Sequence, residues 1–510
     1  MADAVMVRLQ AALMQHQAGD LAAARAGYEA VLAMQPEQAD ALHLLGVLED
    51  QQGHHAEAVA LIRRAVAASP RAANFQGNLG NALRALGDHA EAEAAYREAN
   101  RLDPGDPEAL YNLGNLLRDM RRLGEAEAAF HATLRLAPRH RDALHNLAML
   151  LWEEYDAPEA DAFFAQALAL TPQDHALRMH YGLYCLGRDR FDPGWALYES
   201  RWQSGLYPER DWGMGKPLWR GEPLAGRHLL LWGEQGVGDQ MLYGTMLREA
   251  IQRAGAGRVT IAVSDRLVPL YARAFSALGV AVTTREGAAA AADLQCPFAS
   301  LGGILRRAPA DFAGHDGAYL RADPQQRDTL RQRYAAWAKP GDRLLGISWR
   351  STNARLADHK SIPLPLLAPL FALPGITWIS VQYGDVAADI AAAGAPVRID
   401  DSIDAMRDMD GFAAQLGALD GVVSISNSAV HMAGALGLPC DLLLPLGAGR
   451  LWYWPRPAPV PTAVRAAVSD SDTESDAKSR WYGSLRLWHQ TVTCDWRAPI
   501  ANLAGCLNPG

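Results

Sequence analysis

The chain contains few features of a secreted, membrane-bound or nucleic-acid-binding protein. Its five cysteines show no Cys-x-x-Cys spacing, and the N-terminus has neither a charged leader nor an apolar signal core. These absences favour a reducing, cytoplasmic location over a disulfide scaffold. No apolar run approaches the roughly 18 residues that cross a bilayer, so we expect membrane association only through a partner.

The charge distribution also argues against nucleic acid as the main partner. The formal net charge is −9, and lysine and arginine form no block anywhere in the 510 residues. Binding to a phosphate backbone or an anionic membrane needs clustered cations, so only local basic sites are compatible with this pattern. The length predicts three domains at roughly 100–200 residues each.

A strict 34-residue period occupies the first two-fifths of the chain. Within each period a small pair such as Leu79-Gly80 is followed by an alanine and then a larger side chain such as Tyr96. The small residues let two helices approach closely, and the larger ones fill the gap to the next unit. The pattern predicts a tetratricopeptide superhelix whose groove binds a protein partner. The prolines that mark the period are Pro36, Pro70, Pro104, Pro138 and Pro172.

We expect this α-solenoid to cover residues 1–205 and to end in a degenerate unit. Leu206 stands where the next proline is due, and residues 191–202 are rich in aromatic side chains. Terminal repeats are atypical because one side has no neighbouring repeat, so this segment is predicted to cap the solenoid and to pack on the next domain. Residues 206–225, rich in Gly, Pro and Trp, predict a packed connector.

One repeat position holds asparagine in three successive units, at Asn78, Asn112 and Asn146. An amide side chain both donates and accepts, so it satisfies a peptide backbone. These residues are therefore candidates for binding an acceptor polypeptide. The alternative is that they contact the neighbouring helix and have no role in binding.

Beyond residue 226 the hydrophobic period changes to that of alternating strands and helices. Two successive runs of β-α units predict two doubly wound parallel sheets, in residues 226–335 and 336–510, with a ligand cleft at the carboxyl ends of the strands. Residues 322–340 are expected on the hinge side. The predicted strands are 228–232, 259–263, 344–349, 376–381, 421–426 and 440–444.

A glycine-rich turn follows the first of these strands, in the segment Gly233-Glu-Gln-Gly-Val-Gly-Asp239. Gly236 and Gly238 are predicted to permit a tight turn and the close approach of a ligand. Asp239 is placed at a helix N-terminus, where it either projects into the cleft or caps the helix.

Groups that can donate hydrogen bonds to an anion follow two predicted strands of the second sheet. The loop 350–360 carries Ser351, Thr352 and three cations, including Arg355 and Lys360, which suit a phosphate but are also typical of a solvated loop. A helix start offers free N–H groups to an anion. The further candidates at this helix start are Ser426, Asn427, Ser428 and His431. Gln382, Gly447 and Trp452 follow two other strands and are placed where the base and ribose of a bound nucleotide would lie.

Two of these candidates have simple structural alternatives. His431 lies about one turn into the helix that begins near Ser428, so it either reaches the same anion or is a core histidine. Trp452 either stacks on a base or packs against its neighbours.

Taken together, the motifs resemble TPR-linked bacterial glycosyltransferases, which are related to heptosyltransferases and, in overall plan, to O-GlcNAc transferase. The resemblance spans essentially the whole chain and implies a GT-B fold, a nucleotide-sugar donor and transfer without a bound metal or another cofactor. The motifs that carry it are residues 233–239, Ser361-Ile-Pro363, residues 428–437 and residues 481–487.

The resemblance also assigns roles to individual residues. Asp239 is similar to the catalytic base proposed for heptosyltransferases, and Glu234 in the same turn is a weaker alternative. Lys360 matches a lysine that contacts phosphate in those enzymes. Ser426 replaces a residue that is commonly acidic in relatives, so we predict a donor that itself carries a carboxylate, such as a CMP-activated nonulosonic acid, because like charges at contact repel.

The function implied is transfer of a sugar to Ser or Thr of a protein held in the groove, with flagellin as the expected acceptor. Two alternatives remain open. The acceptor is a glycan or lipid-linked sugar, or the chain is a non-catalytic scaffold that binds a nucleotide.

Two other segments are given structural interpretations. Asp408-Met-Asp410 looks like a metal-binding Asp-x-Asp, but a helical segment follows at once, so Asp410 is expected to cap that helix. The acidic, serine-rich run 469–479 has too little apolar content to pack and is predicted to be a loop beside the cleft.

Overall fold

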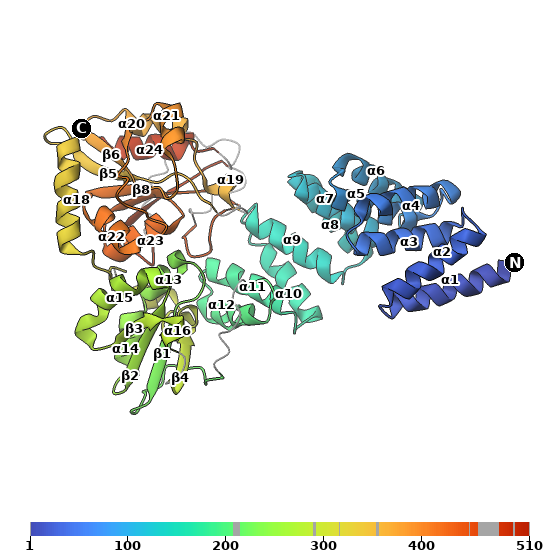
Figure 1. The fold of residues 1–510 in the computed structure, drawn as a ribbon, viewed down its shortest axis with the longest axis horizontal. Coiled ribbons are helices and arrows are strands. Elements are labelled where there is room, and N and C mark those ends of the chain that lie inside the picture. The colour runs from blue at the N-terminus through green and yellow to red at the C-terminus, as the bar shows by residue number, and fades with distance from the viewer. Residues whose placement is uncertain are drawn as a thin grey trace. The chain divides into compact units, whose positions relative to one another are not determined.

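The chain folds as two compact units in a computed structural model (Figure 1). One unit contains residues 1–151 and 157–172, and the other contains residues 152–156 and 173–510. The structure describes residues 2–207, 215–288, 292–315, 317–352, 356–447, 449–456, 479–492 and 495–508. Arg355 and all but the last residue of the acidic run 469–479 lie outside these ranges.

Paired helices build the first unit, and each proline of the 34-residue period follows the second helix of a pair, where proline cannot continue the helix. The tetratricopeptide prediction is therefore confirmed at the level of secondary structure. The helices are α1 (Ala2–Gln17), α2 (Leu21–Met34), α3 (Ala39–Gln51), α4 (His55–Ala68), α5 (Ala73–Leu86), α6 (His89–Leu102), α7 (Pro107–Asp119), α8 (Leu123–Leu136), α9 (Arg141–Glu153) and α10 (Ala160–Leu170).

Close packing inside each helix pair depends on the glycine of the Leu-Gly pair. A Cβ added at Gly80 would lie 2.6 Å from Cε1 of Tyr96, and one at Gly114 would lie 2.7 Å from Cε1 of Phe130. Both rings are fully buried. The glycines are therefore required because the partner helix presents a large ring at the point of contact.

The degenerate last repeat belongs to the second unit. It consists of α11 (His175–Gly187), α12 (Phe191–Tyr198) and a short 3-10 helix, Glu199–Trp202. Trp195 donates its indole N–H to the carbonyl of Arg306 at 2.8 Å, and Gly302 leaves room for its ring. The predicted packing of this aromatic segment on the next domain is confirmed. In the connector, Trp219 is fully buried and Leu218 pairs with Gln295.

The first parallel sheet has the strand order β3-β2-β1-β4. In this sheet β1 lies between β2 and β4, with His228 opposite Arg258 and Leu229 opposite Leu294. Its strands are β1 (His228–Trp232), β2 (Arg258–Val263), β3 (Ala281–Thr284) and β4 (Leu294–Pro297), and its helices include α13 (Val237–Gly244), α14 (Leu247–Ala254), α15 (Val268–Phe275), α16 (Arg285–Ala288) and α17 (Gly302–Leu305).

The second parallel sheet has the order β10-β9-β8-β5-β6-β7. Its strands are β5 (Arg343–Ile347), β6 (Ile376–Ser380), β7 (Val397–Arg398), β8 (Gly421–Ile425), β9 (Cys440–Leu444) and β10 (Leu485–His489). The helices are α18 (Pro324–Trp337), α19 (Ala357–Lys360), α20 (Ala368–Phe371), α21 (Ala387–Ala393), α22 (Met409–Gly417), α23 (Ser428–Leu436) and α24 (Arg497–Leu507). The predicted hinge side, residues 322–340, is largely the helix α18.

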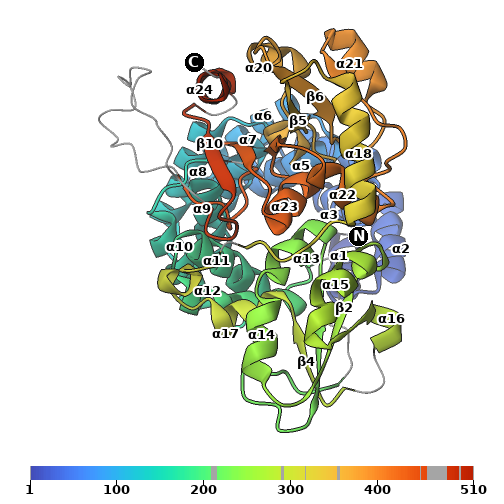
Figure 2. The ribbon, with the colours of Figure 1, turned by 90° about the vertical axis from the view of Figure 1, so that its left-hand side faces the viewer.

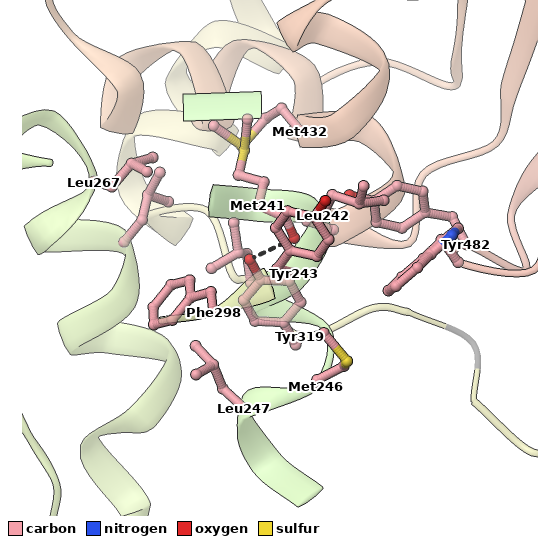
Figure 3. Close-up of a cluster of buried hydrophobic side chains, with 14 of the residues drawn as sticks. Met241, Leu242, Tyr243, Met246, Leu247, Leu267, Phe298, Tyr319, Met432 and Tyr482 are labelled. Atoms are coloured by element: carbon pink, nitrogen blue, oxygen red, sulfur yellow. Dashed lines mark hydrogen bonds between the residues drawn. The ribbon is translucent and has the colours of Figure 1, made fainter. Parts of the chain in front are cut away.

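One apolar core joins the two sheets. Helix α13 of the first sheet packs against α23 of the second, and the two lie side by side in Figures 1 and 2. Figure 3 shows Met241 and Tyr243 of α13 gathered with Met432 and Tyr482 from the second sheet. The Tyr319 hydroxyl donates to the carbonyl of Met241 at 3.0 Å. The carboxyl ends of β1, β5 and β8 are thereby brought towards one another.

We expect two glycines of one helix to respond in opposite ways to alanine. Gly80→Ala should destabilise by about 1–3 kcal/mol, because the new methyl group meets the buried Tyr96 ring. Gly77→Ala, three residues away with no atom within 4 Å of its Cβ position, should stabilise by about 0.5–1 kcal/mol. Urea unfolding of the full chain followed by circular dichroism measures both, and equal effects would contradict this packing.

Candidate functional site

The turn after β1 is made by a residue other than the predicted glycines. Gln235 has a positive φ of 63°, whereas Gly236 is extended and Gly238 lies within α13. The Gln235 amide donates to the Tyr198 hydroxyl at 2.9 Å, which holds this conformation. The prediction that Gly236 and Gly238 form the tight turn is therefore wrong, because side-chain contacts hold the left-handed residue in place.

Gly238 instead permits contact between the two sheets. A Cβ added there would lie 3.1 Å from Cδ2 of His431, on α23. The close approach expected of this glycine is present, and its partner in the structure is a histidine of the second sheet.

Asp239 and Lys360 come from the two different sheets, and the charge of each affects the pKa of the other. Burial raises the pKa of Asp239 to about 6, while the Gly236 N–H and the Lys360 charge act to lower it. Burial lowers the pKa of Lys360 to about 8, against the attraction of Asp239. At pH 7 the carboxylate and the ammonium are both mainly charged, and both lie near their titration ranges.

This region is more enclosed than the predicted open cleft. Lys360 is 4% exposed and His431 is 3% exposed, whereas Asp239, Asn427 and Ser428 are half-buried. The difference arises because α13 and α23 pack directly on each other.

Glu234 is a structural residue, which corrects its assignment as an alternative base. Its carboxylate accepts from Arg201 at 3.0 and 3.1 Å, from the Tyr207 hydroxyl at 3.1 Å and from the Ala299 N–H at 2.9 Å. Glu234 and Arg201 are both fully buried. Although burial alone would lower it, the carboxylates of Glu234 and Glu199 raise the pKa of Arg201 well above its usual value.

The start of α23 is capped by the chain itself. The Asn427 side chain accepts from the Ala429 N–H at 3.0 Å and donates to the Ser348 hydroxyl at 2.7 Å. One of the N–H groups expected to bind an anion is therefore already satisfied. Ser428, the first residue of the helix, remains half-buried beside it.

Gln382 holds the loop after β5 and is not free to bind a base or ribose. Its amide oxygen accepts from the Ser348 hydroxyl at 3.0 Å and from the backbone N–H groups of Trp349 and Arg350 at 3.0 and 2.8 Å. Its amide nitrogen donates back to the Arg350 carbonyl at 3.0 Å. The predicted contact with a donor is wrong for this amide, because the loop uses its hydrogen-bonding groups.

Other contacts fix the rest of this loop. The Ser351 N–H donates to the Ser361 hydroxyl at 3.0 Å, and the Thr352 N–H donates to the Tyr383 hydroxyl at 3.2 Å. The roles of Ser351 and Thr352 in donor binding stay predictions.

His431 lies in an aromatic cage. Its ring nitrogens are 3.3 Å from the hydroxyls of Tyr482 and Tyr453, and its ring stacks on Trp454. Burial, and then the charge of Lys360, lowers its pKa to about 3. The histidine is therefore neutral, and these hydrogen bonds set the orientation of its ring. The Ser426 hydroxyl, 3% exposed, accepts from the indole N–H of Trp454 at 2.9 Å.

Gly447 packs against the segment after α9, and Trp452 packs against α12 of the last repeat. Gly447 has a φ of 75°, and a Cβ there would lie 2.7 Å from the carbonyl oxygen of Glu154. The Trp452 ring meets Trp195 edge-on at 5.3 Å and Trp481 at 6.1 Å. Of its two interpretations, packing is present, and the ring also lines a cavity of about 300 Å³.

The repeated asparagines differ from one another. The Asn78 amide nitrogen lies 2.8 Å from Nε2 of His43, and the Asn146 amide donates to Asn115 at 2.8 Å. These two therefore contact a neighbouring repeat. Half-buried Asn112 makes no such contact with the described residues, so it is the best acceptor-binding candidate of the three.

The Asp-x-Asp segment has a structural role, but the helix is capped by Asp408 and not by Asp410 as predicted. Asp408 caps α22 by accepting from the Gly411 N–H at 2.8 Å. Asp410, predicted as the cap, accepts from both Arg273 terminal nitrogens at 2.7 and 2.8 Å and so links α22 to α15.

Sequence reasoning missed Arg201, Tyr453 and Trp454, which surround the site. The aromatic content of their segments was a signal of packing. It did not identify their partners, which lie tens of residues away in the sequence.

Comparison with known proteins identifies the repeats. Tetratricopeptide repeat families match residues 9–73, 43–107, 83–150 and 141–171. Protein FlbA of Caulobacter vibrioides is 29% identical over 282 residues, and the match covers 51% of this chain and 46% of that protein. The chain thus spans about half the length of this curated relative. No helix in the described ranges is long and apolar enough to span a bilayer.

Solved structures resemble the repeat region. One reports the functional characterisation of Pseudomonas aeruginosa pilF, with 22% identity, 38% of this chain and 89% of that chain covered, and a TM-score of 0.36. Another is YrrB, a TPR protein with an unusual peptide-binding site, with 24% identity, 34% and 89% covered, and a TM-score of 0.30.

We expect Glu234→Gln to lower the free energy of unfolding by about 3–5 kcal/mol, because it leaves Arg201 buried without its main counter-charge. Glu222→Gln removes an exposed partner of Arg227 and should change stability by less than about 0.5 kcal/mol. Denaturant unfolding of both variants tests this. A stable but inactive Glu234→Gln protein would instead make Glu234 catalytic.

Proposed function

We propose that the chain is a GT-B glycosyltransferase that moves a sugar from a nucleotide-sugar to Ser or Thr of a polypeptide bound by the repeats. The observation that carries the proposal is the Asp239–Lys360 pair. A carboxylate with a pKa of about 6 and an ammonium with a pKa of about 8 come from two parallel sheets and interact through their charges. Ligands of doubly wound sheets bind at this edge of the strands.

The two side chains have complementary tasks in sugar transfer. Asp239 takes the proton of the acceptor hydroxyl as its oxygen attacks the anomeric carbon. The bond from that carbon to the phosphate oxygen breaks, and its electron pair leaves with the nucleotide. The Lys360 ammonium and the start of α23 stabilise the negative charge that develops on the departing phosphate.

The raised pKa of Asp239 suits a base at neutral pH. A carboxylate with an ordinary pKa near 4 is a weaker proton acceptor than one that titrates near 6. The lowered pKa of Lys360 has the same origin in burial, and a bound phosphate would raise this pKa and so keep the ammonium charged. The site therefore favours an anionic ligand, which the Lys360 ammonium can pair with.

The repeats are proposed to deliver the polypeptide acceptor. Tetratricopeptide arrays bury continuous cores and leave concave surfaces that bind partners. Flagellin is the first acceptor to test, because flagellin glycosyltransferases belong to the group that the motifs resemble. Intact-mass analysis of flagellin incubated with this protein and a donor detects the transfer.

The donor is proposed to be a CMP-activated nonulosonic acid. The Ser426 hydroxyl accepts from the Trp454 indole N–H, so this position carries no carboxylate that would repel an acidic donor. A panel of CMP-, UDP- and ADP-sugars tests the assignment. Transfer from the hexose donors alone would reject the nonulosonic acid and leave the reaction class intact.

The pH dependence of kcat/KM should be bell-shaped. Activity should fall below about pH 6 as Asp239 gains a proton and loses its basic form. It should also fall above about pH 8 as Lys360 loses its charge. Asp239→Asn should lower kcat about 10²–10⁴-fold and remove the acidic limb, and Lys360→Met should lower it about 10²–10³-fold.

Surface substitutions provide the controls. Asp328→Asn removes a carboxylate that is 61% exposed, and Lys339→Met removes an exposed ammonium. Both should leave the profile unchanged. An acidic limb that persists in Asp239→Asn would assign the base to another residue.

Asn112→Ala should raise the KM for a polypeptide acceptor about 2–10-fold by removing one amide contact, while donor hydrolysis stays unchanged. Asn74→Ala, at an exposed position of α5, is the control. Steady-state kinetics with varied acceptor measures the effect. An unchanged KM in Asn112→Ala would exclude this amide from acceptor binding.

A further inference from the structure

We propose that the cavity beside the aromatic cage binds a ligand that carries a carboxylate. The cavity has a volume of about 300 Å³, within the size range of small-ligand sites. Cations and aromatic rings share its wall. The lining residues that matter are Arg188, Arg456, Arg480, Trp452, Trp454 and Trp481.

Three arginines converge on a single aspartate next to the cavity. Arg188 and Arg450 approach the Asp156 carboxylate at 3.2 and 2.9 Å, and Arg456 pairs with the same carboxylate. Three guanidinium groups therefore share one counter-charge. Buried charges are normally matched by partners, so this cluster has capacity for a second anion.

An unused donor accompanies this positive charge. Arg450 is 6% exposed, and its Nη1 has no hydrogen-bond partner among the described residues, whereas Nη1 of Arg456 pairs with Asp156. Burial lowers the pKa of both arginines to about 10, and the nearby Arg188 adds to this for Arg450. Buried donors are rarely left without an acceptor.

A histidine beside the cluster carries no charge. Burial, and then Arg450, lowers the pKa of His489 to about 4, so this ring is neutral. At the rim, Arg480 pairs with Asp189 at 2.6 Å. In the ion pairs of the described residues, Arg188, Arg450 and Arg456 thus share Asp156, and Arg480 pairs with Asp189.

The apolar wall favours a carboxylate over inorganic phosphate. A phosphate dianion is costly to remove from water, whereas a carboxylate is borne on a carbon skeleton that the indole rings can cover. Guanidinium groups bind carboxylates through paired N–H donors. The ligand is therefore a sugar acid or an acidic side chain of a polypeptide.

The cavity adjoins the candidate catalytic site. Tyr453 and Trp454 line it, and the same two residues contact His431 through the Tyr453 hydroxyl and the Trp454 ring. A ligand in the cavity would lie behind the histidine that packs on Gly238. The proposal does not depend on glycosyl transfer.

Calorimetric titration of the full chain tests the proposal with matched probes. N-acetylneuraminate represents a sugar acid, with neutral N-acetylmannosamine as its control. The peptide acetyl-Gly-Asp-Glu-Ser-Gly-amide represents an acidic polypeptide, with its Asn/Gln counterpart as control. We expect one acidic probe to bind at least about tenfold more tightly than its neutral control, and the probe that binds identifies the source of the carboxylate.

Arg456→Gln and Arg480→Gln should each weaken that binding about tenfold or more, which is about 1.4 kcal/mol. Arg307→Gln, an arginine that is 61% exposed and paired with Asp192, should leave it unchanged. Circular dichroism checks the fold, and the rim variant Arg480→Gln keeps the test valid if Arg456→Gln does not fold. Equal affinity for acidic and neutral probes, tighter binding of inorganic phosphate, or no binding overturns the proposal.

A last experiment removes the negative charges of segment 469–479. The variant combines Asp470→Asn, Asp472→Asn, Glu474→Gln and Asp476→Asn. Unchanged binding supports an external ligand. Binding seen only in this variant would mean that the arginines serve the chain's own carboxylates, and would overturn the proposal.

Discussion

The buried ion pair of Arg201 and Glu234 is the constraint on which the site depends. It joins the 3-10 helix that ends the last repeat to the turn after β1. Two charges out of water are tolerated only when their remaining hydrogen-bonding groups are also satisfied. Here Glu199, Ser300, Tyr207 and the Ala299 N–H complete the network. The turn that leads to Asp239 is fixed as a result.

The electrostatics of the site arise from contact between the sheets. The pKa values of Asp239 and Lys360 move towards each other mainly because both groups are buried where the two sheets meet. Gly238 is part of this arrangement, since any side chain there would press on His431. The same packing that joins the apolar cores therefore tunes the acid-base pair.

The sequence predicted the repeats and the six most apolar strands because these depend on local periodicity. It missed β3, β4, β7 and β10, which are short or partly exposed, and so carry weak patterns. The roles of Glu234, Gln382 and Asp410 were wrong for another reason. Each residue type was suited to the predicted task, but its partner is 32 to 137 residues away. Such pairings follow from tertiary contacts that a single sequence does not encode locally.

The aromatic cage connects two regions of opposite electrostatic character. On one side, a carboxylate and an ammonium from the two sheets interact through their charges. On the other side, arginines exceed carboxylates around Asp156. His431, Tyr453 and Trp454 separate them with uncharged, hydrogen-bonded rings. Because charge interactions in such surroundings are weakly screened, an anion bound beside the arginines would change the field at Lys360 and Asp239. The cage is therefore an uncharged wall across which the two charged regions act on each other.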